Sequence, residues 1–411
     1  MSATPISNPT ASSNSVVLIT VSGQDAPGIT SELTGILSQG KLTILDIGQA
    51  VIHGLLSLSI LFEMGSDKED KTIIKDLLFK AHELGMKLEF RVMTSQLLEK
   101  TQWRGKAYRY AVTLIAPQIS ARALHEVTAV MAKYRVNIDE IERLSEGEFG
   151  CVELLVSSSE EIDRRLLKKE LLEIANQQRV DIALQAEGLY RRSKRLVVFD
   201  MDSTLIQNEV IDEFARECGR YDEVSEVTHA AMKGKMDFDE SLRLRVEKLK
   251  GLTNAQIDAV FSRIELTHGA ADLIRVLKKL GYKTALISGG FACIADRFKE
   301  KLGIDYAYAN VLEMHQGKAT GKVIPPIVNA QRKADLLELI AQQENIHADQ
   351  VIAIGDGAND IPMLERAGLG IAFNAKPLVR EHADFSINQK NLRSILYLMG
   401  ISGRDLNEVL V

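Results

Sequence analysis

The first half of the chain shows one hydrophobic pattern twice. From Val16 to Met93, short apolar runs of strand length alternate with segments in which apolar residues recur every three or four positions. These periods predict strands and helices respectively, in the order strand, helix, strand, strand, helix, strand. The same order recurs from Tyr108 to Gln185. A βαββαβ order is typical of the ferredoxin-like module. We therefore expect two such domains in tandem, over residues 16–96 and 107–186, with the polar segment 96–106 as their joint.

The second half contains three apolar runs that each end in polar residues. Leu196–Phe199, Thr284–Ile287 and Val351–Ile354 suit strands that are buried on both faces of a parallel sheet. In open α/β sheets, ligands bind just beyond the carboxyl ends of such strands. The residues found there are Asp200-Met201-Asp202-Ser203-Thr204, Ser288-Gly289-Gly290 and Gly355-Asp356-Gly357-Ala358-Asn359-Asp360.

These strand ends carry groups suited to binding a charged ligand. Asp200 and Asp202 are so close that their carboxylates repel unless a cation neutralises them or their pKa values are pushed apart. Gly289 and Gly290, which precede an expected helix, can offer backbone N–H groups to phosphate oxygens. Taken alone, the first strand end is explained equally well by an ordinary turn with a helix cap. Three such ends together favour a ligand site.

The motifs resemble those of the haloacid-dehalogenase-like phosphatases and, within them, of the phosphoserine phosphatases. Four separated motifs stand in the family's order, at 200–204, 288–290, Lys333 and 355–360, and the likeness covers about the C-terminal half of the chain. Asp202 is part of it, because P-type ATPases of the same superfamily have a threonine there and cannot protonate a leaving alcohol. The resemblance implies an α/β domain over residues 187–411, with a Rossmannoid parallel sheet and an inserted helical cap.

The resemblance also implies a reaction, the hydrolysis of O-phospho-L-serine to L-serine and phosphate. Asp200 is the expected nucleophile, which forms an aspartyl-phosphate. Asp202 is expected to protonate the leaving serine oxygen and then to deprotonate the attacking water, which requires a raised pKa. The implied Mg²⁺ ligands are the Asp200 carboxylate, the Asp202 backbone carbonyl and the Asp356 carboxylate, with Asp360 holding the site.

The same resemblance implies the residues that bind the phosphoryl group. They are Ser288, the Gly289 N–H and Lys333, with Asn359 adding a hydrogen bond nearby. Without the surrounding motifs, Lys333 would be interpreted as an ordinary solvent-exposed lysine.

Residues 207–267 form too long a segment for a simple connection between strand and helix, so they are interpreted as the helical cap. In isolation, Glu209 and Arg245 look like solvated helix charges, and Met232 and Phe238 like core residues. Phosphoserine phosphatases have these residue types at matching offsets, and the resemblance therefore assigns all four to the substrate. Arg245 suits the substrate carboxylate as a bidentate donor, and Glu209 suits the ammonium group.

The first ferredoxin-like module opens with a loop, Gly23–Ile29, that resembles the first loop of amino-acid-binding ACT domains. Without the resemblance, it is a turn in which Asp25 or Thr30 caps the next helix. The resemblance implies an effector site at Asp25 and Gly28, and we expect L-serine to bind there, within a homodimer. The second module has no glycine in the corresponding segment, Ala116–Ala121, so its loop is a doubtful ligand site.

Composition narrows the function further. The net charge is −6, with 50 basic and 56 acidic residues, so no electrostatic footprint for nucleic acid is present. The short basic cluster Arg191–Arg195 is interpreted as a solvated linker. Cys151, Cys218 and Cys293 show no pairing pattern and fit a reducing cytoplasm. Residues 1–15 contain no lysine or arginine and are expected to form a disordered tail rather than a signal peptide. No apolar run reaches membrane-spanning length.

Two other functions stay open at this point. One is a related phosphatase that acts on another small metabolite, against which only the cap residues argue. The other is an amino-acid-sensing regulatory protein with an inert phosphatase domain. The intact set of Asp200, Asp202, Lys333 and Asp356 argues against inertness.

Overall fold

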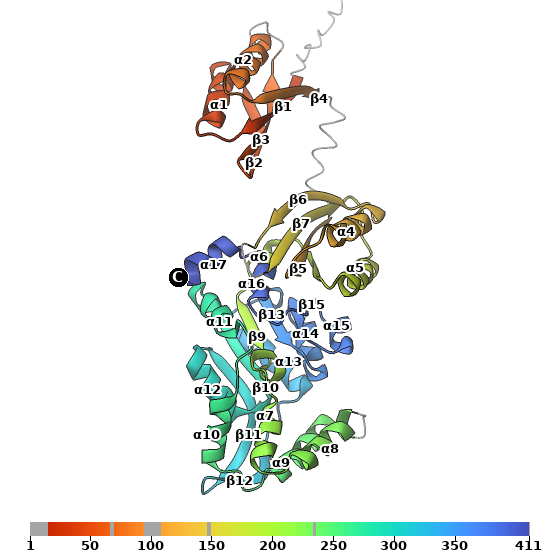
Figure 1. The fold of residues 1–411 in the computed structure, drawn as a ribbon, viewed down its shortest axis with the longest axis vertical. Coiled ribbons are helices and arrows are strands. Elements are labelled where there is room, and N and C mark those ends of the chain that lie inside the picture. Colours follow the sequence, from red (N-terminus) through yellow and green to blue (C-terminus); the bar gives the residue numbers. More distant parts are fainter. Residues whose placement is uncertain (1–14, 66–69, 94–107, 146–148, 233–235, 411) are drawn as a thin grey trace, which may run out of the picture. The chain divides into compact units, whose positions relative to one another are not determined.

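The computed structural model describes residues 15–65, 70–93, 108–145, 149–232 and 236–410, which fall into two compact units, 1–106 and 107–411 (Figure 1). The expected tail lies outside the described residues except for Ser15, which begins the first strand. The expected joint at 96–106 also lies outside them. No described helix is long and apolar enough to cross a membrane.

The first unit is a four-stranded antiparallel sheet with two helices packed on one face. Its strand order is β2-β3-β1-β4, which confirms the expected ferredoxin-like module. Val17, Ile19 and Val21 alternate toward the helices and are fully buried, as the period of two predicts. The elements are β1 (Ser15–Gln24), α1 (Ile29–Gln39), β2 (Thr43–Ile52), β3 (Leu55–Met64), α2 (Asp70–Glu83) and β4 (Lys87–Met93).

The second unit begins with the other ferredoxin-like module, whose strand order β6-β7-β5-β8 repeats that of the first. Helices α4 and α5 pack on one face through residues such as Val127 and Leu171. Two modules with one topology confirm the tandem repeat predicted from the sequence. The elements are β5 (Tyr108–Ala116), α4 (Ala121–Lys133), β6 (Asn137–Arg143), β7 (Gly150–Ser158), α5 (Arg164–Gln178) and β8 (Asp181–Ala186).

The opposite face of this second module packs against the rest of the unit. Ile115, Cys151 and Ala183 are fully buried in the same hydrophobic cluster as Phe199 of the catalytic domain. Asp181 accepts hydrogen bonds of 2.8 to 3.2 Å from the side chain and backbone of Asn388 and from the backbone of Gln389. This module and the catalytic domain therefore share one core.

The segment between β8 and the strand that begins at Leu196 corrects one interpretation of the sequence. The cluster Arg191–Arg195 is only partly solvated: Arg192 and Arg195 are exposed, but the Arg191 side chain is 3% exposed and forms ion pairs with Glu153 and Glu187. Lys194 is also buried and donates to the Asp349 carbonyl at 2.6 Å. Sequence composition alone could not show this, because the partner carboxylate of Glu153 and the Asp349 carbonyl come from distant segments.

The catalytic domain contains a seven-stranded sheet in the order β12-β11-β10-β9-β13-β14-β15, in which all strands but β12 are parallel. The chain starts at β9, builds one side through β10 and returns to the other side at β13, so the strand order reverses beside β9. Such a switch point is where open α/β sheets bind ligands. The strands are β9 (Leu196–Phe199), β10 (Lys283–Phe291), β11 (Tyr306–His315), β12 (Lys318–Ile324), β13 (Val351–Gly355), β14 (Leu369–Phe373) and β15 (Phe385–Ile387).

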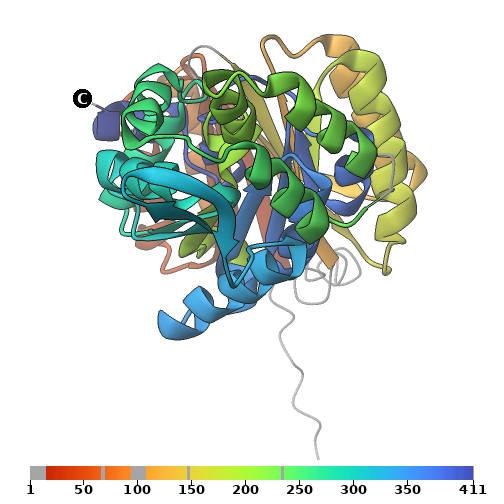
Figure 2. The same cartoon turned by 90° about the horizontal axis from the view of Figure 1, so that it is seen from below.

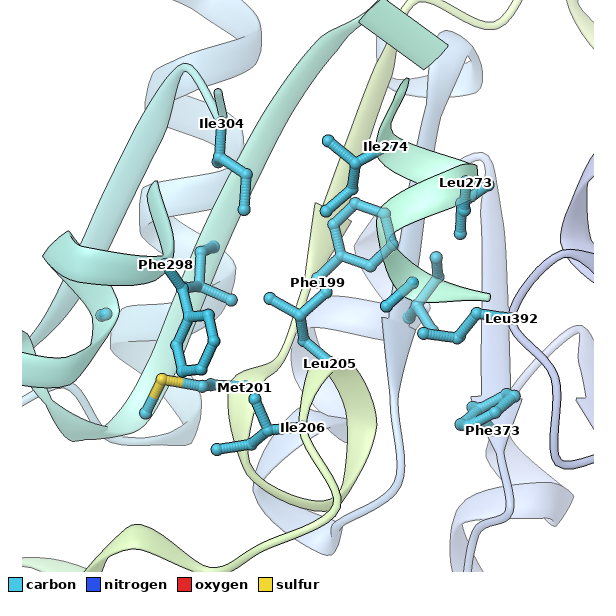
Figure 3. Close-up of a cluster of buried hydrophobic side chains, with 14 of the residues drawn as sticks. Phe199, Met201, Leu205, Ile206, Leu273, Ile274, Phe298, Ile304, Phe373 and Leu392 are labelled. Carbon is cyan, nitrogen blue, oxygen red and sulfur yellow. The ribbon is translucent and has the colours of Figure 1, made fainter. Parts of the chain in front are cut away.

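Helices cover both faces of this sheet, which confirms the buried parallel strands expected from the apolar runs. Figure 3 shows one side of the core, where Phe199 of β9 lies near Ile274 of α11, and Met201 lies near Phe298 of α12. The helices are α6 (Leu189–Arg192), α11 (Ala270–Lys279), α12 (Ala292–Leu302), α13 (Ala330–Gln343), α14 (Ile361–Arg366), α15 (Pro377–His382), α16 (Ser394–Leu398) and α17 (Gly403–Leu410).

The cap consists of α7 (Val210–Glu217), α8 (Tyr221–Met232), α9 (Phe238–Lys248) and α10 (Asn254–Arg263), which lie in front of the sheet in Figure 2. Its two connections to the sheet pair with each other at Ile206 and Leu266. The tip of the β11–β12 hairpin is also bonded to the cap, because the Gly251 N–H donates to the Ala319 carbonyl and the Ala319 N–H donates to the Leu252 carbonyl, both at 2.8 Å. The cap is thus attached to the core at two places.

Candidate active site

The carboxyl ends of three adjacent strands meet below the cap. The Asp200 N–H donates to the Ile354 carbonyl at 2.9 Å, which sets the end of β9 beside the end of β13. Ser288 extends from β10 on the other side. A cleft of about 650 Å³ lies between these ends and the cap. Its described lining includes the predicted residues Asp200, Asp202, Glu209, Phe238, Arg245, Gly289, Asp356 and Asn359.

Lys333 lies beneath this cleft with no exposed surface. Its Nζ donates to Asp200 and, at 2.7 Å, to Oδ1 of Asp360. Burial acts to lower the pKa of Lys333, but the two carboxylates raise it above its usual range. Burial raises the pKa of Asp200 well above its usual value, with Asp360 adding to the rise and Lys333 opposing it. The ammonium group is therefore a fixed positive charge beside Asp200.

Two hydrogen bonds hold the side chain of Asp202. Its Oδ1 accepts from the Val210 N–H at 2.9 Å, and its Oδ2 accepts from the Ser288 hydroxyl at 3.4 Å. Burial, with Glu209 adding to it, raises the pKa of Asp202 to about 7. A Cβ atom on Gly290 would lie 2.5 Å from Asp202 Oδ2, so only glycine leaves room for this carboxyl group. Asp202 can thus carry a proton near neutral pH.

Asp200, Asp356 and Asp360 bring carboxylate oxygens within 4.8 Å of one another. Burial, together with Asp360, raises the pKa of Asp356 to about 7. The ammonium group of Lys333 can neutralise only one of these three carboxylates. A divalent cation that prefers oxygen ligands would neutralise the remaining negative charge. Both oxygens of Asp360 already accept bonds, from Lys333 and from the Gly357 N–H. The two carboxylates free to hold the cation are therefore Asp200 and Asp356.

The geometry adds a residue to which the sequence motif assigned no role. The Thr204 hydroxyl is fully buried and donates to Asp356 Oδ1 at 3.0 Å. The Thr204 carbonyl in turn accepts from the Thr267 hydroxyl at 2.7 Å. Thr204 therefore orients Asp356 across the switch point. One signal for Thr204 was present in the sequence, its position shortly after Asp200 at the end of a strand. The sequence did not show that Thr204 contacts Asp356, which lies 152 positions further along the chain.

The cap places three of its four predicted residues at the cleft. The Glu209 carboxylate accepts from the Ser203 hydroxyl at 2.8 Å, and Ser203 has a left-handed backbone with φ 56°. Arg245 donates from Nε to the Ser241 carbonyl at 3.3 Å. Phe238 lies over Gly289, where a Cβ atom would be 3.1 Å from its ring. Met232 ends α8, and its side chain lies outside the described part of the structure. Further residues that line the cleft are Asp212, Met236 and Lys376.

The loop expected to bind an effector in the first module is open. Gly28 is the N-cap of α1 with φ 98°, and nothing lies within 4 Å of the position of a Cβ atom there. No side chain caps the helix at Gly28, and the Thr30 hydroxyl instead donates to Gln49 at 2.7 Å. The alternative of a turn with a side-chain cap is therefore wrong, and glycine is required at 28 by its backbone.

Comparison with known proteins extends these observations to the whole chain. A model of haloacid dehalogenase-like hydrolases matches residues 194–368, and two ACT domain models match residues 15–91 and 109–185. The chain is 40% identical over 390 residues to a phosphoserine phosphatase of Streptomyces coelicolor, across 95% of this chain and 93% of that protein. It is 39% identical over 386 residues to phosphoserine phosphatase SerB2 of Mycobacterium tuberculosis, across 94% of this chain and 93% of that protein.

A solved structure supports the fold independently. A haloacid dehalogenase family hydrolase from Salmonella enterica serovar Typhi has a TM-score of 0.64 and 32% sequence identity, and the match covers 71% of this chain and 98% of that one.

Proposed function

Because the chain belongs to the phosphoserine phosphatases of the haloacid dehalogenase-like hydrolases, it converts O-phospho-L-serine into L-serine and phosphate, the last step of serine biosynthesis, and we propose that Asp200 is its nucleophile. The observation that supports this role is the Asp200 carboxylate at the switch point, bonded to the buried Lys333. Attack of one Asp200 oxygen on phosphorus forms an aspartyl-phosphate and releases the serine oxygen.

The leaving oxygen requires a proton, for which Asp202 is the donor. Its pKa of about 7 leaves a large fraction of the carboxyl group protonated at neutral pH. Once serine has left, the Asp202 carboxylate accepts a proton from the water that hydrolyses the aspartyl-phosphate. The hydrogen bond from the Val210 N–H keeps Asp202 in place for both transfers, because the single proton of the Ser288 hydroxyl is donated to the phosphoryl group when the substrate is bound.

The transferred phosphoryl group is held by groups that the fold has already oriented. Lys333, the Ser288 hydroxyl and the Gly289 N–H are the proposed donors to its oxygens, with Asn359 at the edge of the cleft. Fixed donors stabilise the negative charge of the transition state without reorganising.

Mg²⁺ is the cation that best fits the acidic cluster. We propose that the carboxylates of Asp200 and Asp356 and the Asp202 backbone carbonyl hold it, while Asp360 positions Lys333 and the 355–360 turn. When bound, Mg²⁺ supplies positive charge to the phosphate oxygens. Without it, Asp200 and Asp356 repel the anionic substrate.

The cap supplies recognition of the amino-acid end of the substrate. Arg245 is proposed to bind the carboxylate and Glu209 the ammonium group, with Phe238 beside the small side chain. Met232 stays a proposed substrate residue on the resemblance alone. Arg245 and Glu209 carry opposite charges and line one cleft, which suits a zwitterion attached to a phosphate.

Regulation and assembly complete the proposal. L-serine is the proposed effector, bound at the Asp25–Gly28 loop of the first ACT domain within a homodimer. The three free cysteines, Cys151, Cys218 and Cys293, fit a reducing cytoplasm as the place of the reaction.

A phosphate-release assay over a panel of phosphoesters tests this function. Purified protein with Mg²⁺ should hydrolyse O-phospho-L-serine with the highest kcat/KM, and Asp200→Asn should abolish turnover while the thermal unfolding temperature stays close to that of the parent. A higher kcat/KM for another ester would indicate a related metabolite phosphatase. No turnover of any ester would indicate a regulatory protein.

A further inference from the structure

A fourth strand end also reaches the cleft. The cleft is lined by Lys376, three residues after β14, together with the 356–359 turn that follows β13. Helix α15, which Lys376 precedes, packs against that turn. No motif of the family-like pattern includes Lys376, although the rule that ligands bind at the carboxyl ends of parallel strands applies to β14 as much as to β9.

The backbone around Lys376 is fixed, whereas its side chain is exposed. The Asn374 N–H donates to the Ile387 carbonyl at 2.8 Å, and Asn374 turns the chain with φ 46°. Ala375 is buried, and its carbonyl accepts from Arg380 Nε at 2.6 Å. The Lys376 carbonyl caps the start of α15 by accepting from the Val379 N–H at 3.0 Å. A rigid base therefore carries a long, flexible cation at the edge of the cleft.

The charges that line the cleft indicate what the Lys376 ammonium group can do. Among its described lining residues, five are acidic and two are basic, Arg245 on the cap and Lys376 on the core. The acidic residues are Asp200, Asp202, Glu209, Asp212 and Asp356. The substrate carries a phosphate of about −1.5 to −2, a carboxylate and an ammonium group, so it enters an acidic cleft as an anion. Like charges disfavour this approach, and a cation at the entrance offsets them.

Lys376 lies on the phosphate side of the cleft. It shares that side with Asp356 and Asn359, and Arg245 lies on the cap with the residues proposed for the amino-acid end. Lys376 is exposed and forms no ion pair with another described residue, so its ammonium group is available to a ligand. Lys333 is different, since Asp200 and Asp360 already engage its Nζ below the cleft.

We propose that Lys376 is a substrate-binding residue that captures the phosphoryl group of the entering ester and contacts the phosphate product as it leaves. The proposal deepens the phosphatase function and rests on it. Because the contact is made with the phosphoryl group before chemistry, Lys376 acts on kcat/KM and on phosphate affinity rather than on kcat. It does not distinguish between esters, in contrast to Arg245.

Four proteins test this role: the parent, Lys376→Met, Lys376→Arg and the control Lys169→Met. Lys169 is exposed on α5 and does not line the cleft, so its loss changes the net charge equally. At low ionic strength, Lys376→Met should lower kcat/KM about tenfold for both phosphoserine and an aryl phosphate, with kcat within about twofold. Added salt should reduce the difference in kcat/KM between Lys376→Met and the parent. Lys376→Arg should retain most of the parent's kcat/KM, and Lys169→Met should retain all of it.

Inhibition by inorganic phosphate gives a readout that does not depend on which ester is preferred. Lys376→Met should weaken this inhibition about tenfold when an aryl phosphate is the substrate. Unchanged phosphate inhibition and kcat/KM in Lys376→Met would overturn the proposal, as would a loss confined to kcat. A parent enzyme that prefers another ester would contradict the phosphoserine function but leave the role of Lys376 testable by phosphate inhibition.

Discussion

At Lys333, an ammonium group without exposed surface contacts two carboxylates, Asp200 and Asp360. Lys333 stands three and four positions before Leu336 and Leu337, on the buried face of α13, but a lysine in the first turn of a helix is normally solvated. Only the resemblance to a family identified it. Thr204 and Lys376 were missed for a related reason, because a contact between strand ends depends on strand order, which local sequence does not encode.

The charge deficit at the acidic cluster predicts how pH and Mg²⁺ affect stability. Burial raises the folded-state pKa of Asp202 and Asp356 to about 7, whereas the unfolded values are near 3.9. The folded protein binds more protons between these values, so the free energy of unfolding of metal-free protein should decrease as pH rises from about 4 to 7. Mg²⁺ binds the deprotonated carboxylates of Asp200 and Asp356, and its stabilising effect should therefore increase as these groups lose their protons.

Thermal unfolding at pH 5 and pH 7.5, each with chelator or with Mg²⁺, measures this effect. We expect a clear rise in Tm with Mg²⁺ at pH 7.5, little at pH 5, and a much smaller rise in Asp356→Asn. An equal effect of Mg²⁺ at both pH values would show that the carboxylates of Asp200 and Asp356 do not hold the cation.

Arg245 allows a test of substrate recognition by one side chain. Arg245→Ala should lower kcat/KM for phosphoserine, with a loss of transition-state stabilisation of about 2–4 kcal/mol, because one charge-assisted bidentate contact is lost. An aryl phosphate, which has no carboxylate, should be affected much less. Arg243→Ala, an exposed neighbour on α9, is the matched control and should change neither value. Equal losses on both substrates would assign Arg245 to the fold or to the phosphate.

At the scale of elements, the sequence predicted the three strands that carry the site and the order of helices and strands in the two ferredoxin-like modules. The apolar runs before Asp200 and Asp356 correspond to β9 and β13, and the turn at Gln316 and Gly317 joins β11 to β12. Both turn residues have positive φ, as a tight hairpin requires. What the pattern could not show is that the hairpin tip bonds to the cap, since this depends on how separate elements pack.

The contact between hairpin and cap leads to a prediction for Gly321. It has φ 89°, and a Cβ atom there would lie 3.2 Å from Lys250 Cβ and 3.3 Å from the Glu247 carbonyl. Gly321→Ala should displace the C-terminal end of α9, which carries Arg245, and destabilise the protein by about 1–3 kcal/mol. We expect a lower Tm and a lower kcat/KM for phosphoserine.

Gly303→Ala is the control for backbone strain alone, because Gly303 has φ 70° with open space around a Cβ atom. It should lower Tm by less than Gly321→Ala and leave kcat/KM unchanged. If both variants lose activity to the same extent, the hairpin does not position the cap.

At the scale of the whole molecule, the two ACT domains share a topology, and the second also forms part of the catalytic core. The sheet face of the second carries Ile115, Cys151 and Ala183 into the core of the catalytic domain, and its Asp181 bonds to the segment after β15. The sequence predicted two copies of one module and placed a ligand loop in only the first. It could not predict that the second copy is part of the catalytic core, because ordinary apolar strand residues make this contact.

We place the sensor in the first domain, because its loop carries Gly28 and the corresponding segment of the second domain has no glycine. We predict that L-serine inhibits the enzyme by binding at the Asp25–Gly28 loop, with a coupling free energy of about 1–3 kcal/mol between effector and substrate. The loop has room for a ligand, since the position of a Cβ atom on Gly28 is open. Inhibition alone is not sufficient evidence, because L-serine as product also competes in the catalytic cleft.

Gly28→Asp separates the two effects, because it adds bulk and charge to the loop without changing the cleft. The variant should keep the parent kcat and KM without serine and lose the part of serine inhibition that is not competitive with phosphoserine. Since φ at Gly28 is 98°, any side chain there strains the backbone, and Gly219→Asp, at φ 67° in the cap with open space, controls for that strain. Equilibrium binding of L-serine to Asp200→Asn, with and without Gly28→Asp, counts the sites directly. If Gly28→Asp retains full serine sensitivity and both binding events, the first ACT domain does not sense serine through this loop.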